Sequence, residues 1–409
     1  MRLLVLCPHF KPDTAPTGVV MTRLVDELII LGWEVDVITS LPWYRRHAIE
    51  PGWSGRIRRK VETPWGSIAR LHPFPADKAN LVARAAAFVG FSSIAAVDAS
   101  ARRPRPDAVL VMSPPLTLAI SGWAAARRFG IPLVLNLQDV FPAAAVAVGA
   151  ISNRRAIAVF EALERFCYKR ATAITVLSDE LAKGIERRTG NRVSTPVHVI
   201  PNFADIAGIR PEPTDNAYRR EHELVGKHVV MYAGNVGHSQ AFDLLIGAAE
   251  HLRHRDDIVL VVNGEGVQRM SLQTAAAHLP NVRFVDYQPA DKLPETLAAA
   301  DIHLVLLKPG LSEVSVPSKL YSVMAAGRAV IACVDPGSEI DRLVRDADAG
   351  LSVGHDADAL AAAITTLVDD SAMRRRQASN ARARVETWPT AADIARQYSD
   401  LLEGVTRHQ

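Results

Sequence analysis

Cysteine is scarce in this chain of 409 residues, which holds Cys7, Cys167 and Cys333 far apart, each within an apolar run. Small secreted domains are rich in disulfides, and structural zinc sites keep their cysteines a few residues apart. A disulfide framework and a zinc knuckle are therefore excluded. We expect three buried thiols in a protein of a reducing compartment.

Long hydrophobic runs are also missing. A membrane-spanning helix needs about 18 apolar residues without charge, and the nearest candidate, residues 80–97, carries Arg84 and is followed by Asp98. The apolar run at residues 2–7 is too short for the core of a secretory signal and stops at Pro8. We therefore expect a cytoplasmic protein in which residues 80–97 form a core helix or a helix at a membrane interface.

Charge is spread unevenly along the chain. Residues 1–201 hold 26 Lys and Arg against 16 Asp and Glu, whereas residues 202–409 hold 21 against 28. Basic clusters beside an apolar helix suit an anionic membrane surface, such as the inner face of the plasma membrane, and a solvated basic face explains them equally well. A nucleic-acid partner is not expected, since no such motif and no interleaved aromatic residues are present. The basic clusters are residues 45–47, 56–60 and 102–105.

Short, continuous, often β-branched apolar runs recur along the chain and alternate with helical stretches. Continuous runs are typical of parallel strands that are buried on both faces. The predicted strands are residues 2–7, 34–40, 67–74, 108–113, 132–137, 173–178, 197–201, 228–234, 258–264, 282–287, 302–307 and 329–333.

The alternation of strand and helix continues on both sides of a polar, proline-containing break at residues 202–226. This pattern predicts two doubly wound α/β, Rossmann-like domains that face each other across a cleft. We expect the domains to span residues 1–201 and 202–385, with a helix in residues 386–409 packing back on the first domain. Ligands of such sheets bind at the carboxyl ends of the strands, so chemistry is sought in the loops that follow them.

The loop before the last predicted strand carries the clearest signal. Pro317 is suited to the first turn of a helix that ends near Gly327, and Ser318 and Lys319 follow it. A cation at a helix start is unfavourable unless an anion binds there, so Lys319 and the neighbouring amides predict a diphosphate site. Glu313 is placed to hold sugar hydroxyls; the alternative is a surface ion pair between Glu313 and Lys319.

Loops of the first half give weaker signals. Gly18 precedes a long helical pattern, where a glycine lets backbone N–H groups approach a ligand closely. Asp139 follows a predicted strand and is a candidate base or sugar ligand. A turn glycine and a helix-capping aspartate are the structural alternatives.

Loops of the second half are rich in glycine. Gly234 and Gly237 frame a turn that suits an anion, although the segment matches neither the dinucleotide-binding fingerprint nor the P-loop. Each glycine taken singly is explained by an ordinary turn. The candidate ligand-binding residues of these loops are Gly234, Asn235, Gly264, Glu265, Tyr287 and Gln288.

Several of these segments, taken in order, resemble the family 4 glycosyltransferases of the GT-B fold. The branch is that of the bacterial colanic-acid, capsule and O-antigen transferases, including those for fucosamine. The resemblance covers nearly the whole chain. Its marks include HFKPD, TSLPWY, SPPLTLAISGW, LQDVFP, VIPNF, YAGNVGHSQ and VPSKLYSVMAAGRAVIA.

The resemblance implies a retaining transfer of a sugar from a nucleotide-sugar donor, with UDP favoured, to a glycan or a polyprenyl-linked acceptor. The first domain would bind the acceptor and the second the donor, and no cofactor or catalytic metal is expected. Asp139, Lys319 and Glu313 are the catalytic candidates. The donor-binding candidates are Gly18, Gly234, Asn235, Gly264, Glu265, Tyr287, Gln288, Pro317, Ser318, Lys319 and Tyr321.

The chain departs from the family pattern in three places. Asn235 and Gln240 stand where many relatives carry Arg and Lys, and Ser322 stands near the second of two family glutamates. Ala143 replaces a glutamate after QDVFP, which bears on acceptor choice and on activity. Two alternatives therefore stay open: another GT-B nucleotide-sugar enzyme, such as an epimerase or hydrolase, and a non-catalytic partner protein that binds a nucleotide sugar.

Overall fold

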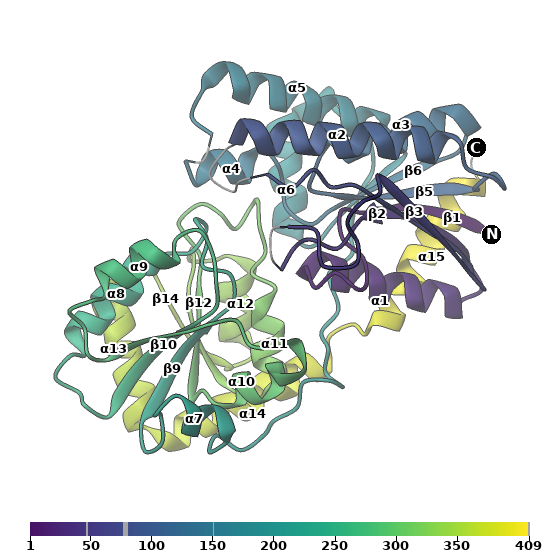
Figure 1. Ribbon diagram of the computed structural model, residues 1–409. Helices are drawn as coiled ribbons and strands as arrows, with labels where there is room; N and C mark the ends of the chain where they lie inside the picture. The colour runs from purple at the N-terminus through teal and green to yellow at the C-terminus, as the bar shows by residue number, and fades with distance from the viewer. Residues whose placement is uncertain (46–47, 77–80, 150, 408–409) are drawn as a thin grey trace. The chain divides into compact units, whose positions relative to one another are not determined.

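The computed structural model describes residues 1–45, 48–76, 81–149 and 151–407, in two units that each hold their own sheet (Figure 1). The first unit comprises Met1–Phe203, Glu313–Val316 and the chain from Pro389 on. The second comprises Ala204–Ser312 and Pro317–Trp388. Two residues of the basic cluster 45–47, Arg46 and His47, and the start of the apolar segment at residue 80 lie outside the described residues.

The sheet of the first unit has eight strands in the order β3-β4-β2-β1-β5-β6-β7-β8. All neighbours are parallel except β3, which pairs antiparallel with β4. The predicted runs of this half form strands, whereas β3, which is charged and mostly exposed, was not predicted. The strands are β1 (Arg2–Leu6), β2 (Glu34–Ser40), β3 (Arg58–Thr63), β4 (Gly66–Leu71), β5 (Ala108–Ser113), β6 (Leu133–Leu137), β7 (Ala173–Val176) and β8 (Val197–Val199).

Helices cover both faces of this sheet, with α1 and α15 on one face and α2, α3 and α5 on the other (Figure 1). None of the helices within the described ranges is long and apolar enough to cross a membrane. The helices are α1 (Pro16–Ile30), α2 (Leu81–Ser100), α3 (Thr117–Phe129), α4 (Ala143–Ala147), α5 (Arg154–Arg170), α6 (Asp179–Thr189) and α15 (Ala391–Arg407).

The last helix, α15, is an integral part of the first unit. Ile394, Tyr398 and Leu402 are buried in the same core cluster as residues of β1 and α1. The Tyr398 hydroxyl accepts a hydrogen bond from Nδ2 of Asn136 at 2.8 Å and lies 2.9 Å from Oγ1 of Thr175. The core of the first unit is thus completed by a segment that lies far from its strands in the sequence.

The sheet of the second unit has six parallel strands in the order β11-β10-β9-β12-β13-β14. The strand order reverses between β9 and β12, and such a switch point is where ligands of open α/β sheets bind. The predicted runs again form strands, and β14 was not predicted. The strands are β9 (His228–Ala233), β10 (Ile258–Asn263), β11 (Val282–Val285), β12 (Ile302–Leu306), β13 (Ala329–Cys333) and β14 (Gly350–Val353).

Helices α8 and α13 pack on each other and on one face of this sheet, and the buried side chains between them form the larger core of the unit. A smaller core cluster lies on the other face and includes Tyr218 of α7 and Leu224. The helices are α7 (Ala217–Glu221), α8 (Phe242–His251), α9 (Arg269–Ala275), α10 (Leu293–Ala298), α11 (Lys319–Ala325), α12 (Glu339–Asp346), α13 (Ala357–Asp369) and α14 (Ser371–Glu386).

The three cysteines are free and buried, as the sequence predicts. Burial disfavours the thiolate and raises the pKa of each thiol to about 12. These cysteines therefore act as small core residues.

Candidate functional site

The loops after β9 and β10 lie backbone against backbone at the carboxyl edge of the second sheet. Gly234 and Gly264 have φ values of +139° and +152°, a region that other residues rarely adopt. A Cβ atom on Gly264 would lie 1.9 Å from the carbonyl oxygen of Gly234, and one on Gly266 would lie 2.2 Å from that of Val236. Glycine is therefore required where these two loops approach each other.

The turn after Gly234 is held by two hydrogen bonds, one to a side chain and one to its backbone. The backbone N–H of Gly237 donates to Oε1 of Gln240 at 3.0 Å, and the Tyr232 hydroxyl donates to the carbonyl of Asn235 at 2.7 Å. The Gln240 side chain and the Asn235 backbone carbonyl thus hold the turn, and neither residue brings a cation to it. Any positive charge at this edge must come from another element.

Lys319, the first residue of α11, supplies that charge. Its ammonium group lies 3.7 Å from the centre of the Tyr232 ring and also donates to the Tyr232 hydroxyl. A Cβ atom on Gly234 would lie 3.1 Å from Nζ of Lys319, so the ammonium group borders the glycine turn directly. We call Lys319, Tyr232, Gly234 and Asn235 the lysine cluster.

The ammonium group of the lysine cluster has no acidic partner among the described residues. Burial lowers the pKa of Lys319 to about 7, while the residue as a whole keeps part of its surface exposed. Within the part of the chain that the structure describes, no carboxylate forms an ion pair with Lys319. The alternative pairing with Glu313 is not found, because Glu313 pairs with Arg187. A partly desolvated ammonium group beside an open glycine turn suits an anionic ligand.

The start of α11 contributes less than the sequence suggests. The helix has seven residues and begins at Lys319 rather than at Pro317. The N–H groups of Leu320 and Tyr321 donate to the carbonyls of Pro317 and Ser318 at 3.1 and 3.3 Å, so two of the amides expected at a diphosphate are already engaged. The charge of Lys319, rather than the helix end, is the main electrostatic feature here.

The remaining candidates of the second unit are more spread out. Tyr287 is 54% exposed. Burial raises the pKa of Tyr232, and an electrostatic interaction with Tyr287 raises it further. Nε2 of Gln288 donates to the carbonyl of Asp286 at 3.1 Å. Tyr321 is turned into the unit and packs on Trp388, with ring centres 4.5 Å apart. The ring of Tyr287 is therefore open to solvent, whereas the ring of Tyr321 fills the protein interior.

A second group of candidates lies in the first unit. Asp139 follows β6, and its Oδ1 accepts a hydrogen bond from the Ser315 hydroxyl at 2.7 Å. Burial raises the pKa of Asp139, an effect that this hydrogen bond partly opposes. Glu313 belongs to the same strip of chain, whose Val314 carbonyl accepts from the N–H of Val140 at 2.9 Å. Asp139 and Glu313 are thereby brought to one place.

Gly18 lies in the first turn of α1. A Cβ atom on Gly18 would lie 2.8 Å from the Cβ of His9, so the helix start packs tightly on the loop that follows β1. The requirement for glycine at this position therefore comes from a close approach within the protein.

Comparison with protein families identifies the chain. The family model for glycosyl transferases group 1 matches residues 227–370, and the model for a glycosyl transferase 4-like domain matches residues 17–202. A GDP-mannose-dependent alpha-mannosyltransferase of Mycobacterium tuberculosis is 30% identical over 305 residues, which cover 73% of this chain and 74% of the relative. The chain belongs to the group 1, family 4-like glycosyltransferases.

Further similarities agree with this family. The putative colanic acid biosynthesis glycosyl transferase WcaI of Escherichia coli K12 is 26% identical over 352 residues, covering 84% of this chain and 86% of that protein. The crystal structure of Anabaena HepE in complex with UDP and glucose shares the fold with a TM-score of 0.72 and 17% identity, over 99% of this chain and all of that one. The predicted family and the predicted fold class are both confirmed.

The sequence did not predict the roles of two residues of this glycosyltransferase, Tyr232 and Arg269. Tyr232 ends a buried strand and carries no sequence signal of its contact with Lys319. The guanidinium group of Arg269 ties the ends of β10 and β11 together, since it donates to the carbonyl of Val285 at 3.0 Å and to Oδ1 of Asp286 at 2.6 Å. It also pairs with Glu265 at 3.2 Å. Arg269 thus holds the loops that carry Glu265 and Tyr287.

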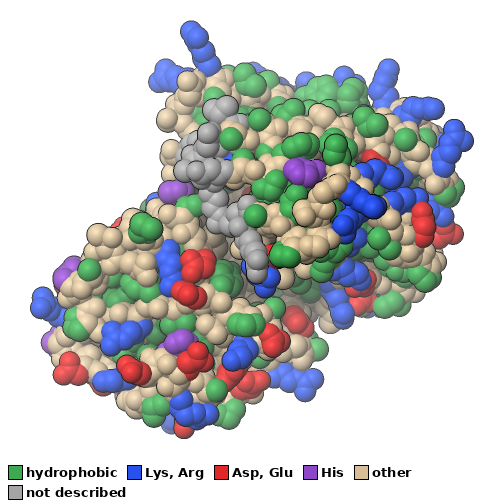
Figure 2. Space-filling view, in the orientation of Figure 1, with side chains coloured by type: hydrophobic (Ala, Val, Ile, Leu, Met, Phe, Trp, Pro, Cys, Tyr) green, Lys and Arg blue, Asp and Glu red, His purple; other side chains and the backbone are tan. Residues whose placement is uncertain are grey.

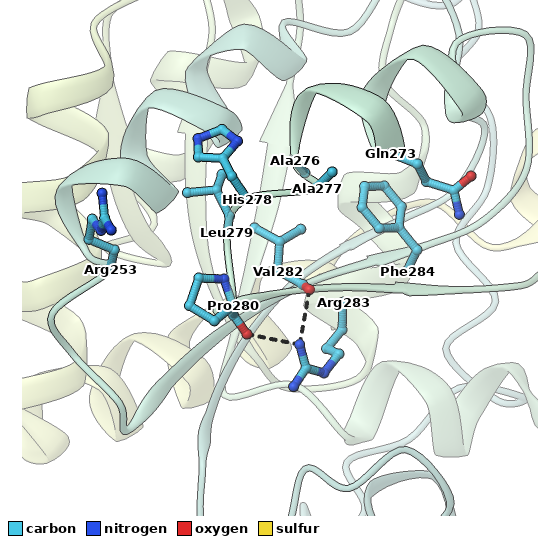
Figure 3. Close-up of a pocket in the computed structure, with 10 residues that line it drawn as sticks. All are labelled: Arg253, Gln273, Ala276, Ala277, His278, Leu279, Pro280, Val282, Arg283 and Phe284. Carbon is cyan, nitrogen blue, oxygen red and sulfur yellow. Dashed lines mark hydrogen bonds between the residues drawn. The ribbon is translucent and has the colours of Figure 1, made fainter.

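A pocket of about 620 Å³ lies elsewhere on the glycosyltransferase, beside α9 and β11 (Figure 3). The guanidinium group of Arg283, one of the lining residues, donates to the carbonyls of Pro280 and Val282 at 2.8 and 3.3 Å. None of the predicted site residues lines it. The lining residues are Arg253, Gln273, Ala276, Ala277, His278, Leu279, Pro280, Val282, Arg283 and Phe284.

Proposed function

We propose that this glycosyltransferase moves a sugar from a nucleoside diphosphate-sugar to a glycan or lipid-linked acceptor, with retention at the anomeric carbon, during synthesis of a cell-surface polysaccharide. The observation that carries the proposal is the lysine cluster, in which a partly buried ammonium group borders a glycine turn at the switch point of the second sheet. A diphosphate provides the counter-ion that Lys319 lacks among the described residues.

The chemistry of this transfer depends on charge at the leaving group. As the glycosidic bond to the donor phosphate breaks, negative charge accumulates on the diphosphate, and a pre-positioned cation stabilises it. We assign this role to Lys319, with the backbone N–H group of Asn235 assisting, because the N–H group of Gly234 already donates to the carbonyl of Asn263 at 2.9 Å. Glu313 is assigned to donor hydroxyls and Asp139 to the reacting sugar or the acceptor. No catalytic metal is included in the proposal.

The donor base is proposed by analogy. Uridine is the first candidate, since HepE, a protein of the same fold, binds UDP. Guanosine is the second, since the Mycobacterium tuberculosis relative depends on GDP-mannose. Cell-surface polysaccharide synthesis is supported by the likeness to the colanic acid transferase.

Membrane attachment is a further part of the proposal, and it rests on the surface of the first unit. The edge strand β3 and the residue before it expose Val61 and Ile57, at 49% and 65%, among basic side chains. Apolar tips within a basic surface suit an anionic membrane, where a lipid-linked acceptor would be met.

Substitution of Lys319 tests the proposal. We expect Lys319→Met to lower the rate of nucleoside diphosphate release by about 10²–10³-fold, because the leaving group loses its cation. The assay uses the donor together with lipid-linked oligosaccharide extracted from cells. Lys292→Met removes an exposed lysine of the same unit and should leave the rate unchanged. If Lys319→Met transfers the sugar at the parent rate, Lys319 does not stabilise the leaving diphosphate.

A thermal-stability panel identifies the donor. We expect one of UDP, GDP, dTDP and ADP, or its sugar conjugate, to raise the melting temperature in the presence of EDTA, because a ligand of the folded state stabilises it. The shift should vanish in Lys319→Met. Protection without turnover in any acceptor extract would favour the non-catalytic nucleotide-sugar-binding protein instead.

A further inference from the structure

Two arginines face each other across the first two strands at the edge of the first sheet. Arg59 of β3 and Arg70 of β4 are direct cross-strand partners. Both guanidinium groups lie against the indole ring of Trp53, with Cζ atoms 5.3 and 5.1 Å from its centre. We call Arg59, Trp53 and Arg70 the arginine–tryptophan sandwich.

The sandwich has no counter-ion among the residues that the structure describes. Arg70 is 5% exposed, and the Nε atoms of Arg59 and Arg70 are buried without a hydrogen-bond partner. Nη2 of Arg70 donates to the carbonyl of Lys11 at 2.6 Å, which is a neutral acceptor. Burial lowers the pKa of Arg70, an effect that the nearby Cys7 partly opposes.

Other basic residues around the sandwich do have acidic partners. Arg58 pairs with Asp98, Lys60 with Glu62 at 2.6 Å, and Lys11 with Asp26 at 2.6 Å. The absence of a carboxylate at the sandwich is therefore a local property and does not reflect a shortage of acidic residues nearby.

This arrangement is costly without a ligand. Like charges directly opposite each other in a sheet are destabilising, and a buried charge without a partner carries a desolvation penalty. Guanidinium groups bind phosphate and carboxylate through paired hydrogen bonds, and stacking on an aromatic ring fixes their orientation. An anion from outside the chain would offset both costs.

The position of the sandwich indicates which ligand supplies the anion. Arg70 lies near the carboxyl end of β4, and the Lys11 carbonyl places it beside the loop after β1. Ligands of open α/β sheets bind at this edge. Figure 2 shows Lys and Arg side chains gathered on the face of the first unit around β3.

We propose that the arginine–tryptophan sandwich binds an anionic group of the acceptor, a phosphate or diphosphate next to the sugar that is extended. The inference rests on the proposed function for the identity of the acceptor, whereas the binding of the anion is independent of it. The acceptor of this enzyme is accordingly a sugar phosphate or a diphosphate-linked lipid rather than a neutral glycan.

Calorimetric titration with inorganic pyrophosphate at low ionic strength, without donor or metal, tests this site. We expect two binding sites in the parent protein, of which Lys319→Met removes one and the double variant R59M/R70M removes the other. Loss of a charge-assisted phosphate contact weakens binding about tenfold or more. Arg128→Met, which removes an arginine stacked on Phe129 elsewhere in the first unit, is the matched control and should bind as the parent does.

The two hypotheses fail separately in this experiment. If Lys319→Met binds pyrophosphate as the parent does, the assignment of Lys319 to the donor diphosphate is wrong. If R59M/R70M binds pyrophosphate as the parent does, the arginine–tryptophan sandwich is not an anion site. We expect the double variant to remain folded, because it removes two like charges from facing positions. Should it not fold, Arg59→Met, whose side chain is less buried, carries the test and should weaken the same site.

Binding to vesicles separates a discrete phosphate site from a general membrane surface. Vesicles of phosphatidylcholine with phosphatidylglycerol are compared with phosphatidylcholine alone. If R59M/R70M loses binding to the anionic vesicles and keeps full pyrophosphate affinity, the anion belongs to lipid headgroups and the acceptor assignment is overturned. Loss of pyrophosphate affinity in the same variant supports it.

Discussion

Lys319 combines partial burial with a position at an open turn. Burial removes water from the ammonium group and lowers its pKa to about 7, close to neutrality. The fold tolerates this cost beside Tyr232, whose ring and hydroxyl are the neighbours of the ammonium group. A small change in surroundings, such as the arrival of a diphosphate, is therefore enough to change the protonation state of this residue.

Donor affinity should depend on pH through Lys319. The pKa of about 7 belongs to the free protein, and a bound diphosphate raises it by favouring the charged form. Below pH 7 the lysine is already protonated and affinity is highest; above it, binding must take up a proton. We expect the dissociation constant of the nucleotide sugar to rise by up to about tenfold per pH unit above neutrality. Calorimetry between pH 6 and 9 measures this.

The control for the pH series is Lys319→Met, whose weaker affinity should be level across the same range. The diphosphate of a nucleotide sugar does not titrate in this interval, so the parent profile reports on the protein. An affinity that improves with rising pH would contradict the assigned role.

At the scale of elements, the loops after β9 and β10 leave no room for a side chain where they approach each other. We expect Gly264→Ala to lower the free energy of unfolding by about 2 kcal/mol or more, because alanine is strained at this positive φ and its Cβ would meet the Gly234 carbonyl. Urea denaturation measures the loss. Gly354→Ala, where the added Cβ meets nothing within 4 Å, should unfold at the parent urea concentration.

The sequence was informative where burial dictates the residue type. Continuous apolar runs located most of the strands, since parallel strands covered by helices on both faces leave little room for polar side chains. The missed strand β3 is an edge strand with charged side chains in solvent, and its pairing depends on the hairpin with β4. Edge strands use charge in this way to avoid aggregation, which hides them from a hydrophobic pattern.

The candidate site was predictable only in part. Lys319 is unusual at a helix start and could be found from local sequence, whereas its contact with Tyr232 joins residues that are distant in the chain. The register that puts Arg59 opposite Arg70 is likewise a property of strand pairing. The local sequence shows only that basic residues cluster at positions 56–60.

At the scale of the whole molecule, the first unit depends on the end of the chain. We expect Tyr398→Phe in α15 to lower the free energy of unfolding of this unit by about 1–2 kcal/mol, because the hydrogen bonds that Asn136 and Thr175 share with the Tyr398 hydroxyl are lost. Chemical denaturation followed by tryptophan fluorescence detects it. Asp400→Asn, on the exposed side of the same helix, is the control, and an equal loss there would contradict the explanation.

The placement of α15 has a consequence for synthesis on the ribosome. The strands of the first unit are made within the first 199 residues, but the helix that covers part of their core starts at residue 391. During translation α1 can cover this face of the sheet early, but the part that α15 covers stays exposed while the whole second unit is produced. Domains fold as units when their chain is available, so the second unit is positioned to fold first and the nascent first unit to need protection by chaperones.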